Sequence, residues 1–235
     1  MFCELHFHTQ ETSRCAKVPA VAGIRAFKEH GYECVVVTDH LNRSYYKEFY
    51  DGTLSYKDAT DKWLMGYRTA KAEGDKLGVK VFLGCELDFD NGIAKNEYLV
   101  YGMTEEMFYE HNELWTLDEK SFKEFADSHG LFVAQAHPFR PWCKPCPAEY
   151  LHGVEVFNSH PRHDQRNHLA MEMWLTSDLI PLCGSDYHEA DAVRGCGVDL
   201  VGDAESIQDI IAMLRKKEFR LVLPGEYTCP TRDTK

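Results

Sequence analysis

The sequence of 235 residues contains no apolar run as long as the ~20 residues that a membrane-spanning helix needs. Its N-terminus lacks the basic and apolar regions of a secretory signal. No stretch rich in proline, glycine and serine divides the chain, and no repeat of fixed period occurs. These absences predict one domain over residues 1–235, a cytoplasmic location and no membrane partner.

Positive charge is also scarce, because 26 Lys and Arg face 38 Asp and Glu, for a net charge of −12. Such a surface repels nucleic acid, so long nucleic acid is not expected as a partner. A small anionic substrate remains compatible, since bound divalent cations reverse the potential inside an acidic pocket. Nine scattered cysteines, Cys229 among them, are an odd number. Without an export signal, we expect reduced thiols rather than a disulfide framework.

Short apolar runs alternate with helical patterns along the chain. Strands are expected at 1–5, 34–37, 79–83, 98–101, 131–134, 154–157 and 180–183, and helices at 18–31, 59–77, 118–129, 164–177 and 206–217. Strands that alternate with helices of this length predict βαβ units and a parallel sheet. So many units without a glycine-rich dinucleotide loop favour a closed or nearly closed α/β barrel over an open sheet.

The expected strands end in histidine and carboxylate side chains. His6 and His8, two residues apart on a strand, point to the same side. The full set at strand ends is His6, His8, Asp39, His40, Glu86, His137, Asp186 and His188. Because barrel active sites lie on the loops after the carboxyl ends of the strands, we expect these side chains to meet.

A set of several imidazoles and carboxylates exceeds the needs of one tetrahedral ion. It predicts two or three divalent metal ions, with Mn, Fe or Zn as suitable elements. Glu86 directly follows a strand and is the candidate bridging carboxylate. Paired ions can bind the attacking and leaving oxygens of a displacement and acidify a bound water. Phosphate ester hydrolysis benefits most, because its transition state carries spread negative charge.

The motifs occur in the order expected for the polymerase and histidinol phosphatase (PHP) family, which the chain resembles over nearly its whole length. They are His6-x-His8-Thr9, Thr38-Asp39-His40, Gly84-x-Glu86, Ala136-His137-Pro138 and Ser185-Asp186-x-His188. The resemblance implies a distorted seven-stranded β/α barrel with a trinuclear metal centre. One metal would take His6, His8, Glu86 and Asp186. A second would share Glu86 and take His137, and a third would take His40 and His188.

Two positions of the family pattern are not matched directly. The family usually supplies an Asp or His from the loop after the first motif, which here runs from Gln10 to Cys15. Glu11 is the expected substitute ligand, with Cys15 as a softer alternative. A further family histidine often comes from the region between Glu86 and His137. His111 is the candidate there, although its helix is expected at the surface, so the position is left open.

Other side chains have candidate roles in catalysis or substrate binding. We assign catalytic roles to Asp39 and Arg140, and substrate contacts to Arg140, Asn158 and His160. Arg140 offers a planar fork to a phosphate, with a structural salt bridge as the alternative. Asp39 either holds a ligand imidazole or caps the following turn. A separate pair, Cys143-x-x-Cys146, has redox and zinc spacing but no partner pair, so two loop thiols near the site mouth are the preferred interpretation.

The predicted function is hydrolysis of the phosphate ester of a small metabolite by a metal-bound hydroxide at a di- or trinuclear site. One alternative is a phosphodiesterase that acts on short oligonucleotides or dinucleotides, as in the polymerase-associated members of the family. Another is a catalytically silent, metal-stabilised module that binds or regulates a partner. The sequence indicates neither the substrate, nor the metal, nor the oligomeric state.

Overall fold

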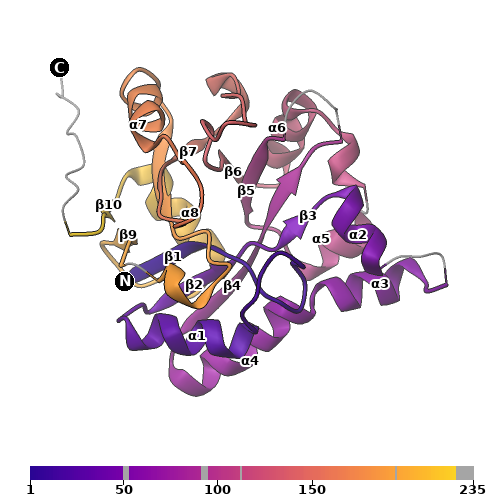
Figure 1. The fold of residues 1–235 in the computed structure, drawn as a ribbon. Helices are drawn as coiled ribbons and strands as arrows, with labels where there is room; N and C mark the ends of the chain where they lie inside the picture. The colour runs from indigo at the N-terminus through magenta and orange to yellow at the C-terminus, as the bar shows by residue number, and fades with distance from the viewer. Residues whose placement is uncertain (50–52, 91–94, 112, 194, 226–235) are drawn as a thin grey trace.

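Seven strands form the wall of a distorted barrel in the computed structural model, which describes residues 1–49, 53–90, 95–111, 113–193 and 195–225 (Figure 1). In spatial order they are β1 (Phe2–Phe7), β2 (Cys34–Val37), β4 (Lys80–Asp88), β5 (Glu97–Tyr101), β6 (Phe132–Gln135), β7 (Gly153–Asn158) and β8 (Ile180–Gly184). The predicted seven-stranded α/β barrel is therefore confirmed. Cys229 lies outside the described residues.

One strand of the wall runs against the others, which corrects the expected parallel sheet. β5 is antiparallel to both β4 and β6, whereas the other neighbouring strands of the wall pair in parallel. Residues 89–96 separate β4 from β5, fewer than the dozen or more that a parallel crossover requires. The short β3 (His40–Leu41) pairs with the end of β4, and the antiparallel β9 (Gly197–Leu200) and β10 (Phe219–Val222) extend the sheet beyond β1.

The helices lie outside the strands. They are α1 (Ala20–Glu29), α2 (Arg43–Phe49), α3 (Tyr56–Trp63), α4 (Met65–Leu77), α5 (Glu105–Glu110), α6 (Glu119–Ser128), α7 (Asn167–Leu175) and α8 (Ile207–Lys216). The helix expected at 59–77 is two helices that meet at Leu64. α1 packs along α4, and α4 in turn covers β4 (Figure 1). No helix of the described ranges is long and apolar enough to cross a membrane.

The wall closes through backbone contacts between the end of β1 and the segment after β8. Tyr187 N donates to His6 O at 3.1 Å, and His8 N donates to Tyr187 O at 3.2 Å. This parallel bridge brings the residues on either side of Tyr187 next to His6 at the end of β1 and His8 just after it. The closure of the barrel and the assembly of the predicted site therefore take place at the same edge.

Alternation along β1 points a polar row into the barrel. Glu4, His6 and His8 face one side, while the apolar side chains between them pack into hydrophobic clusters. The Glu4 carboxylate accepts hydrogen bonds from His6 N at 2.7 Å and Ser185 N at 3.0 Å. Burial raises the pKa of Glu4 to about 7 even though these bonds favour its charged form. The barrel interior next to the site is thus polar and hydrogen-bonded.

The loop after β1 rests against the junction of α3 and α4 at a glycine. Thr12 Oγ1 donates to Trp63 O at 2.8 Å and accepts from Gly66 N at 3.2 Å. A Cβ at Gly66 would overlap the hydroxyls of Thr9 and Thr12 and would come within 2.8 Å of Asp39 Oδ2. Only glycine lets the helix approach the loop this closely.

We expect Gly66→Ala to lower the free energy of unfolding by about 1–3 kcal/mol, because the added methyl group forces the loop away from α4. Denaturant unfolding of the variant and the wild type measures the difference. Gly202→Ala is the control, since a Cβ there meets only Met213 Sδ at 3.7 Å. Equal losses of stability in the two variants would contradict the proposed close packing.

Candidate metal centre

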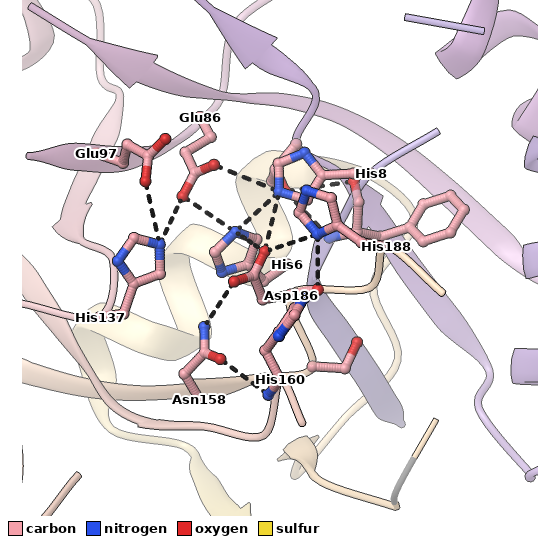
Figure 2. Close-up of polar contacts among 12 residues, drawn as sticks. His6, His8, Glu86, Glu97, His137, Asn158, His160, Asp186 and His188 are labelled. Atoms are coloured by element: carbon pink, nitrogen blue, oxygen red, sulfur yellow. Dashed lines mark hydrogen bonds and ion pairs between the residues drawn. The ribbon is translucent and has the colours of Figure 1, made fainter. Parts of the chain in front are cut away.

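Seven of the eight predicted metal ligands meet at the edge where the barrel closes. They are His6, His8, His40, Glu86, His137, Asp186 and His188. Figure 2 labels all of them except His40. Their nitrogen and oxygen atoms form overlapping groups in which the ligand atoms lie within 4.8 Å of one another. The strand-end prediction therefore places these side chains correctly, and their roles as ligands remain predictions.

Glu86 lies at the centre of this cluster with a fully buried side chain. Its Oε1 atom is 3.1 Å from His6 Nε2 and 3.2 Å from His137 Nε2. Its Oε2 atom is 2.9 Å from His40 Nδ1 and 3.3 Å from His8 Nε2. Each carboxylate oxygen thus faces a different pair of imidazoles, as a carboxylate that bridges two ions would.

The buried atoms of the cluster fit divalent ions. Both Glu86 oxygens and His137 Nε2 lack a hydrogen-bond partner among the described residues. A buried polar group without a partner costs about 1–3 kcal/mol, and a charged one costs more. Ligand atoms about 2.1 Å from one ion are roughly 3.0–3.4 Å apart. Three of the four separations around Glu86 fall in that range, and the fourth, 2.9 Å to His40 Nδ1, lies just below it. This donor set therefore suits metal ions better than internal hydrogen bonds.

Asp186 joins the groups from the segment after β8. Its Oδ1 atom lies 3.4 Å from both His6 Nε2 and His8 Nε2, and 3.1 Å from His188 Nδ1. Its Oδ2 atom forms an ion pair with Arg140 Nη2. One oxygen is thus directed at the histidines, while the arginine holds the other.

Two of the candidate ligands have backbone angles that side chains rarely adopt. The φ angle is 28° at His137 and 51° at Asp186. Such conformations cost of order 1–3 kcal/mol each and persist only where the surroundings enforce them. Glu155 Oε2 accepts from His137 N at 2.9 Å, and Glu4 accepts from Ser185 N beside Asp186. Buried carboxylates of the barrel interior therefore hold both turns.

Glu155 is a functional candidate that the sequence reasoning missed. His6 Nδ1 donates to Glu155 Oε1 at 2.9 Å, which leaves His6 Nε2 free to face Glu86. A carboxylate that accepts from one ring nitrogen fixes the tautomer and orientation of an imidazole whose other nitrogen binds a metal. An acidic residue inside the apolar run of β7 was the available signal, because a charge at a buried strand position needs a partner.

Glu97 is the second missed residue. Its oxygens lie 3.5 Å from His40 Nδ1 and 3.5 Å from His137 Nε2. Because β5 is antiparallel, its first residue lies at the edge where β4 ends, and Glu97 pairs with Asp88. Glu97 is thus a candidate for the open ligand position between Glu86 and His137. His111 does not reach it, since its ring packs on Phe125 and His129 at the end of α5.

The first loop places Cys15, rather than Glu11, beside the histidines. Both oxygens of Glu11 accept from Ala20 N, at 3.1 and 2.9 Å, at the start of α1. This backbone contact holds the carboxylate away from the cluster. The expectation that Glu11 replaces the Asp or His ligand of the family is therefore wrong in its geometry. The Cys15 thiol lies 3.1 Å from His188 Nε2.

The Asp39 carboxylate bonds the loop after β1 rather than the turn that follows Asp39. Its oxygens accept from Thr9 N, Thr9 Oγ1 and Ser13 Oγ, each at 2.7 Å, so it fixes the loop after β1. Ser13 Oγ lies 3.4 Å from His8 Nδ1. Asp39 therefore supports a candidate ligand through Ser13 and does not enter the cluster itself. Burial raises the pKa of Asp39 to about 6, although these hydrogen bonds favour its charged form.

Arg140 and Asn158 form the wall of the site next to Asp186. Arg140 Nε donates to Gln165 Oε1 at 2.7 Å, and its Nη2 atom pairs with Asp186. Asn158 Nδ2 donates to Glu155 Oε2 at 2.9 Å and to Asp186 Oδ2 at 3.4 Å. Arg140 and Asn158 thus both lie at the site and contact a candidate ligand, and their contacts with substrate remain predictions.

A cavity of about 600 Å³ opens over the cluster. His160 lines it, and the His160 ring lies 5.5 Å from the His188 ring. The outer part of the cavity is formed by Lys17, Lys95, Trp142, Arg162, His163 and Glu189. Cys143 is a free thiol near this opening, 3.9 Å from His137 Nδ1, whereas Cys146 is buried. The two thiols also contact different carbonyl groups, that of Lys95 for Cys143 and that of Pro147 for Cys146.

The charges of the cluster favour cation binding. Burial would raise the pKa of Glu86, but His6 and His40 lower it well below its usual value. The pKa of Asp186 is likewise well below its usual value, because His6 and Arg140 outweigh its burial. Both carboxylates therefore stay ionised at neutral pH and are available as ligands.

The model of the PHP domain matches residues 4–217, and the chain belongs to this family. No significant match was found among curated proteins. Three solved structures are similar in fold. A two-domain protein of Bacteroides vulgatus, described as containing a predicted PHP-like metal-dependent phosphoesterase, has 17% identity and a TM-score of 0.68 over 95% of this chain and 65% of that one. The chain therefore spans about two thirds of that protein's length.

The other two are PsfC of Pseudomonas syringae and a lesion-specific endonuclease of Pyrococcus furiosus. PsfC has 18% identity and a TM-score of 0.59 over 89% of this chain and 87% of that one. The endonuclease has 16% identity and a TM-score of 0.59 over 94% and 57%. The family and the fold are those of metal-dependent phosphoesterases. Because the same fold occurs in an endonuclease, it does not by itself exclude a nucleic-acid substrate.

We expect Glu155→Gln to weaken metal binding by about 10–100-fold, because the amide cannot hold the His6 imidazole as a carboxylate does. Isothermal titration of the metal-free protein with Zn²⁺ or Mn²⁺ measures this affinity. Glu149→Gln, at an exposed acid, is the matched control. If Glu155→Gln unfolds like the wild type yet binds metal with unchanged affinity, the orienting role of Glu155 is wrong.

Proposed function

We propose that this protein hydrolyses the phosphate ester of a small metabolite at a centre of two or three divalent ions, for which Mn, Fe and Zn are suitable. The observation that carries the proposal is the buried carboxylate of Glu86, whose oxygens face two pairs of imidazoles. Divalent ions bound there would neutralise phosphate charge and acidify a water molecule. The chemistry of the donor set is thus that of a hydrolytic centre.

The ligand positions divide the donor set among three ions. His6, His8, Glu86 and Asp186 would hold the first ion. His137 and Glu97 would hold the second ion together with Glu86. Glu97 would then replace the histidine that the family often supplies between Glu86 and His137. His40 and His188 would hold the third ion, and His8 lies beside both of them. Glu86 and His40 each belong to two of the ligand groups. This overlap supports a centre in which several ions share ligands rather than a site for one ion.

Arg140 is proposed to orient the phosphate. An arginine has five N–H donors, and the bonds to Gln165, Asn158 and Asp186 use only Nε and Nη2. Arg140 also lines the cavity, so its Nη1 atom can donate to a phosphate oxygen while Nη2 holds Asp186. In this arrangement one guanidinium positions a metal ligand and the substrate together.

The cavity supports a small substrate. Its volume of about 600 Å³ lies within the 300–1,000 Å³ typical of small-molecule sites. Four basic and four acidic side chains line it in a chain with net charge −12, so the cavity is less acidic than the protein as a whole. Divalent ions bound to its carboxylates would make it positive toward an anionic group. The acidic surface elsewhere disfavours long nucleic acid. We therefore retain a small phosphorylated compound as the proposed substrate class.

A phosphodiesterase acting on dinucleotides or short oligonucleotides is the second candidate. Trp142 at the cavity opening is 43% exposed and contacts the His163 ring edge-on at 5.3 Å. Exposed aromatic rings of this kind can stack on nucleic-acid bases. The endonuclease of similar fold also favours this candidate.

An activity panel separates the candidates. With Mn²⁺, Fe²⁺ or Zn²⁺ restored to the purified protein, we expect phosphomonoesters to be cleaved with a higher kcat/KM than dinucleotides. His137→Ala should lower kcat/KM by more than the 10–100-fold that loss of an outer contact costs, because it removes a ligand. His111→Ala, on α5 away from the cluster, should leave the rate unchanged.

Preferential cleavage of dinucleotides would establish the phosphodiesterase instead. A catalytically silent, metal-stabilised module would bind metal but hydrolyse neither class of ester, and Glu86→Ala would alter only its stability. Each of these results would overturn the proposed hydrolysis of a small phosphate ester.

A further inference from the structure

The third ion position contains a thiol in addition to its two histidines. Cys15 Sγ lies 3.1 Å from His188 Nε2, and the His40 ring lies 5.8 Å from the His188 ring. All three residues line the same cavity. Glu11, the acid expected from this loop, is held at α1, so Cys15 is the side chain of the loop that reaches these histidines.

The backbone fixes Cys15 at this position. Ala16 N donates to Ser13 O at 2.8 Å, which folds the loop just before and after the thiol. On the far side, Lys17 N donates to His188 O at 2.8 Å and ties the loop to the segment that carries His188. Ser13 is itself held by Asp39. The approach of Cys15 to His188 is therefore built by the main chain as well as by the contact between the two side chains.

The orientation of the His188 ring supplies a second observation. His188 Nδ1 donates to Asp186 O at 2.9 Å. This bond leaves Nε2 as the nitrogen with a lone pair, and Nε2 is the atom that faces Cys15 Sγ. A ring nitrogen fixed in this way by a backbone carbonyl is the usual arrangement of a metal-ligating histidine. The ring thus presents a ligand atom to the space that the thiol borders.

We propose that Cys15 supplies a thiolate ligand to the third ion, together with His40 and His188, and that this position selects Zn²⁺ over Mn²⁺. The inference rests on the proposed metal centre. Zinc binds both imidazole and thiolate, and zinc sites with three protein ligands keep an open fourth position. Zn–S distances of about 2.3 Å and Zn–N distances of about 2.1 Å put S and N about 3.6 Å apart in a tetrahedral site. The 3.1 Å between Cys15 Sγ and His188 Nε2 therefore has to widen by about half an ångström when the ion binds. Thiolate is a poor ligand for Mn²⁺, which prefers oxygen.

Cobalt spectroscopy tests the proposal directly. The metal-free protein is titrated with Co²⁺, and the near-ultraviolet thiolate-to-cobalt charge-transfer band is recorded beside the visible cobalt bands. We expect the charge-transfer band in the wild type and its loss in Cys15→Ser. Cys143→Ser is the matched control, because Cys143 is also a half-buried thiol near the opening but donates to Lys95 O at 3.2 Å. It should keep the band.

The outcomes separate this proposal from the proposed function. Visible cobalt bands without a charge-transfer band in the wild type, or a band that survives in Cys15→Ser, would overturn the thiolate ligand and leave the metal centre in place. Failure to bind Co²⁺ at all would overturn both. In competition, Zn²⁺ should remove the charge-transfer band at a lower concentration than Mn²⁺. Removal at equal concentrations would overturn the selectivity.

Discussion

The burial of one carboxylate, that of Glu86, is the constraint on which the site depends. Its two oxygens face four imidazoles, yet neither oxygen has a hydrogen-bond partner among the described residues. Taking a charged carboxylate out of water costs several kcal/mol unless opposite charge compensates it. Divalent cations would supply that compensation, and they would also separate imidazole nitrogens such as His6 Nε2 and His8 Nε2, which lie 3.1 Å apart.

The barrel is built so that this constraint can be met. The closing bridge at Tyr187 brings Asp186 and His188 to the two histidines around the end of β1, so the fold is sealed where the ligands gather. Glu4 and Glu155, from inside the barrel, hold the strained turns before Asp186 and at His137. Fold and site thus share the same hydrogen bonds, which explains why so many buried acids lie in a chain with an otherwise apolar sheet.

The sequence predicted the barrel and the meeting of seven strand-end side chains because parallel strands all deliver their carboxyl ends to one edge. It missed Glu97 because that rule reverses for an antiparallel strand, whose first residue reaches the edge. Glu155 was missed because alternation inside a short apolar strand does not reveal which residue points inward. Glu11 was preferred over Cys15 on chemical grounds, but the backbone path of a short loop decides which side chain arrives, and composition does not encode that path.

The central claim is that Glu86 bridges two metal ions in this protein. Anomalous X-ray diffraction from crystals of the Zn²⁺-loaded protein tests it most directly. The account predicts anomalous peaks on both sides of the Glu86 carboxylate, each about 2.0–2.2 Å from one of its oxygens. Saturating Zn²⁺ with no peak beside Glu86, or with a single ion bound elsewhere on the chain, would contradict it.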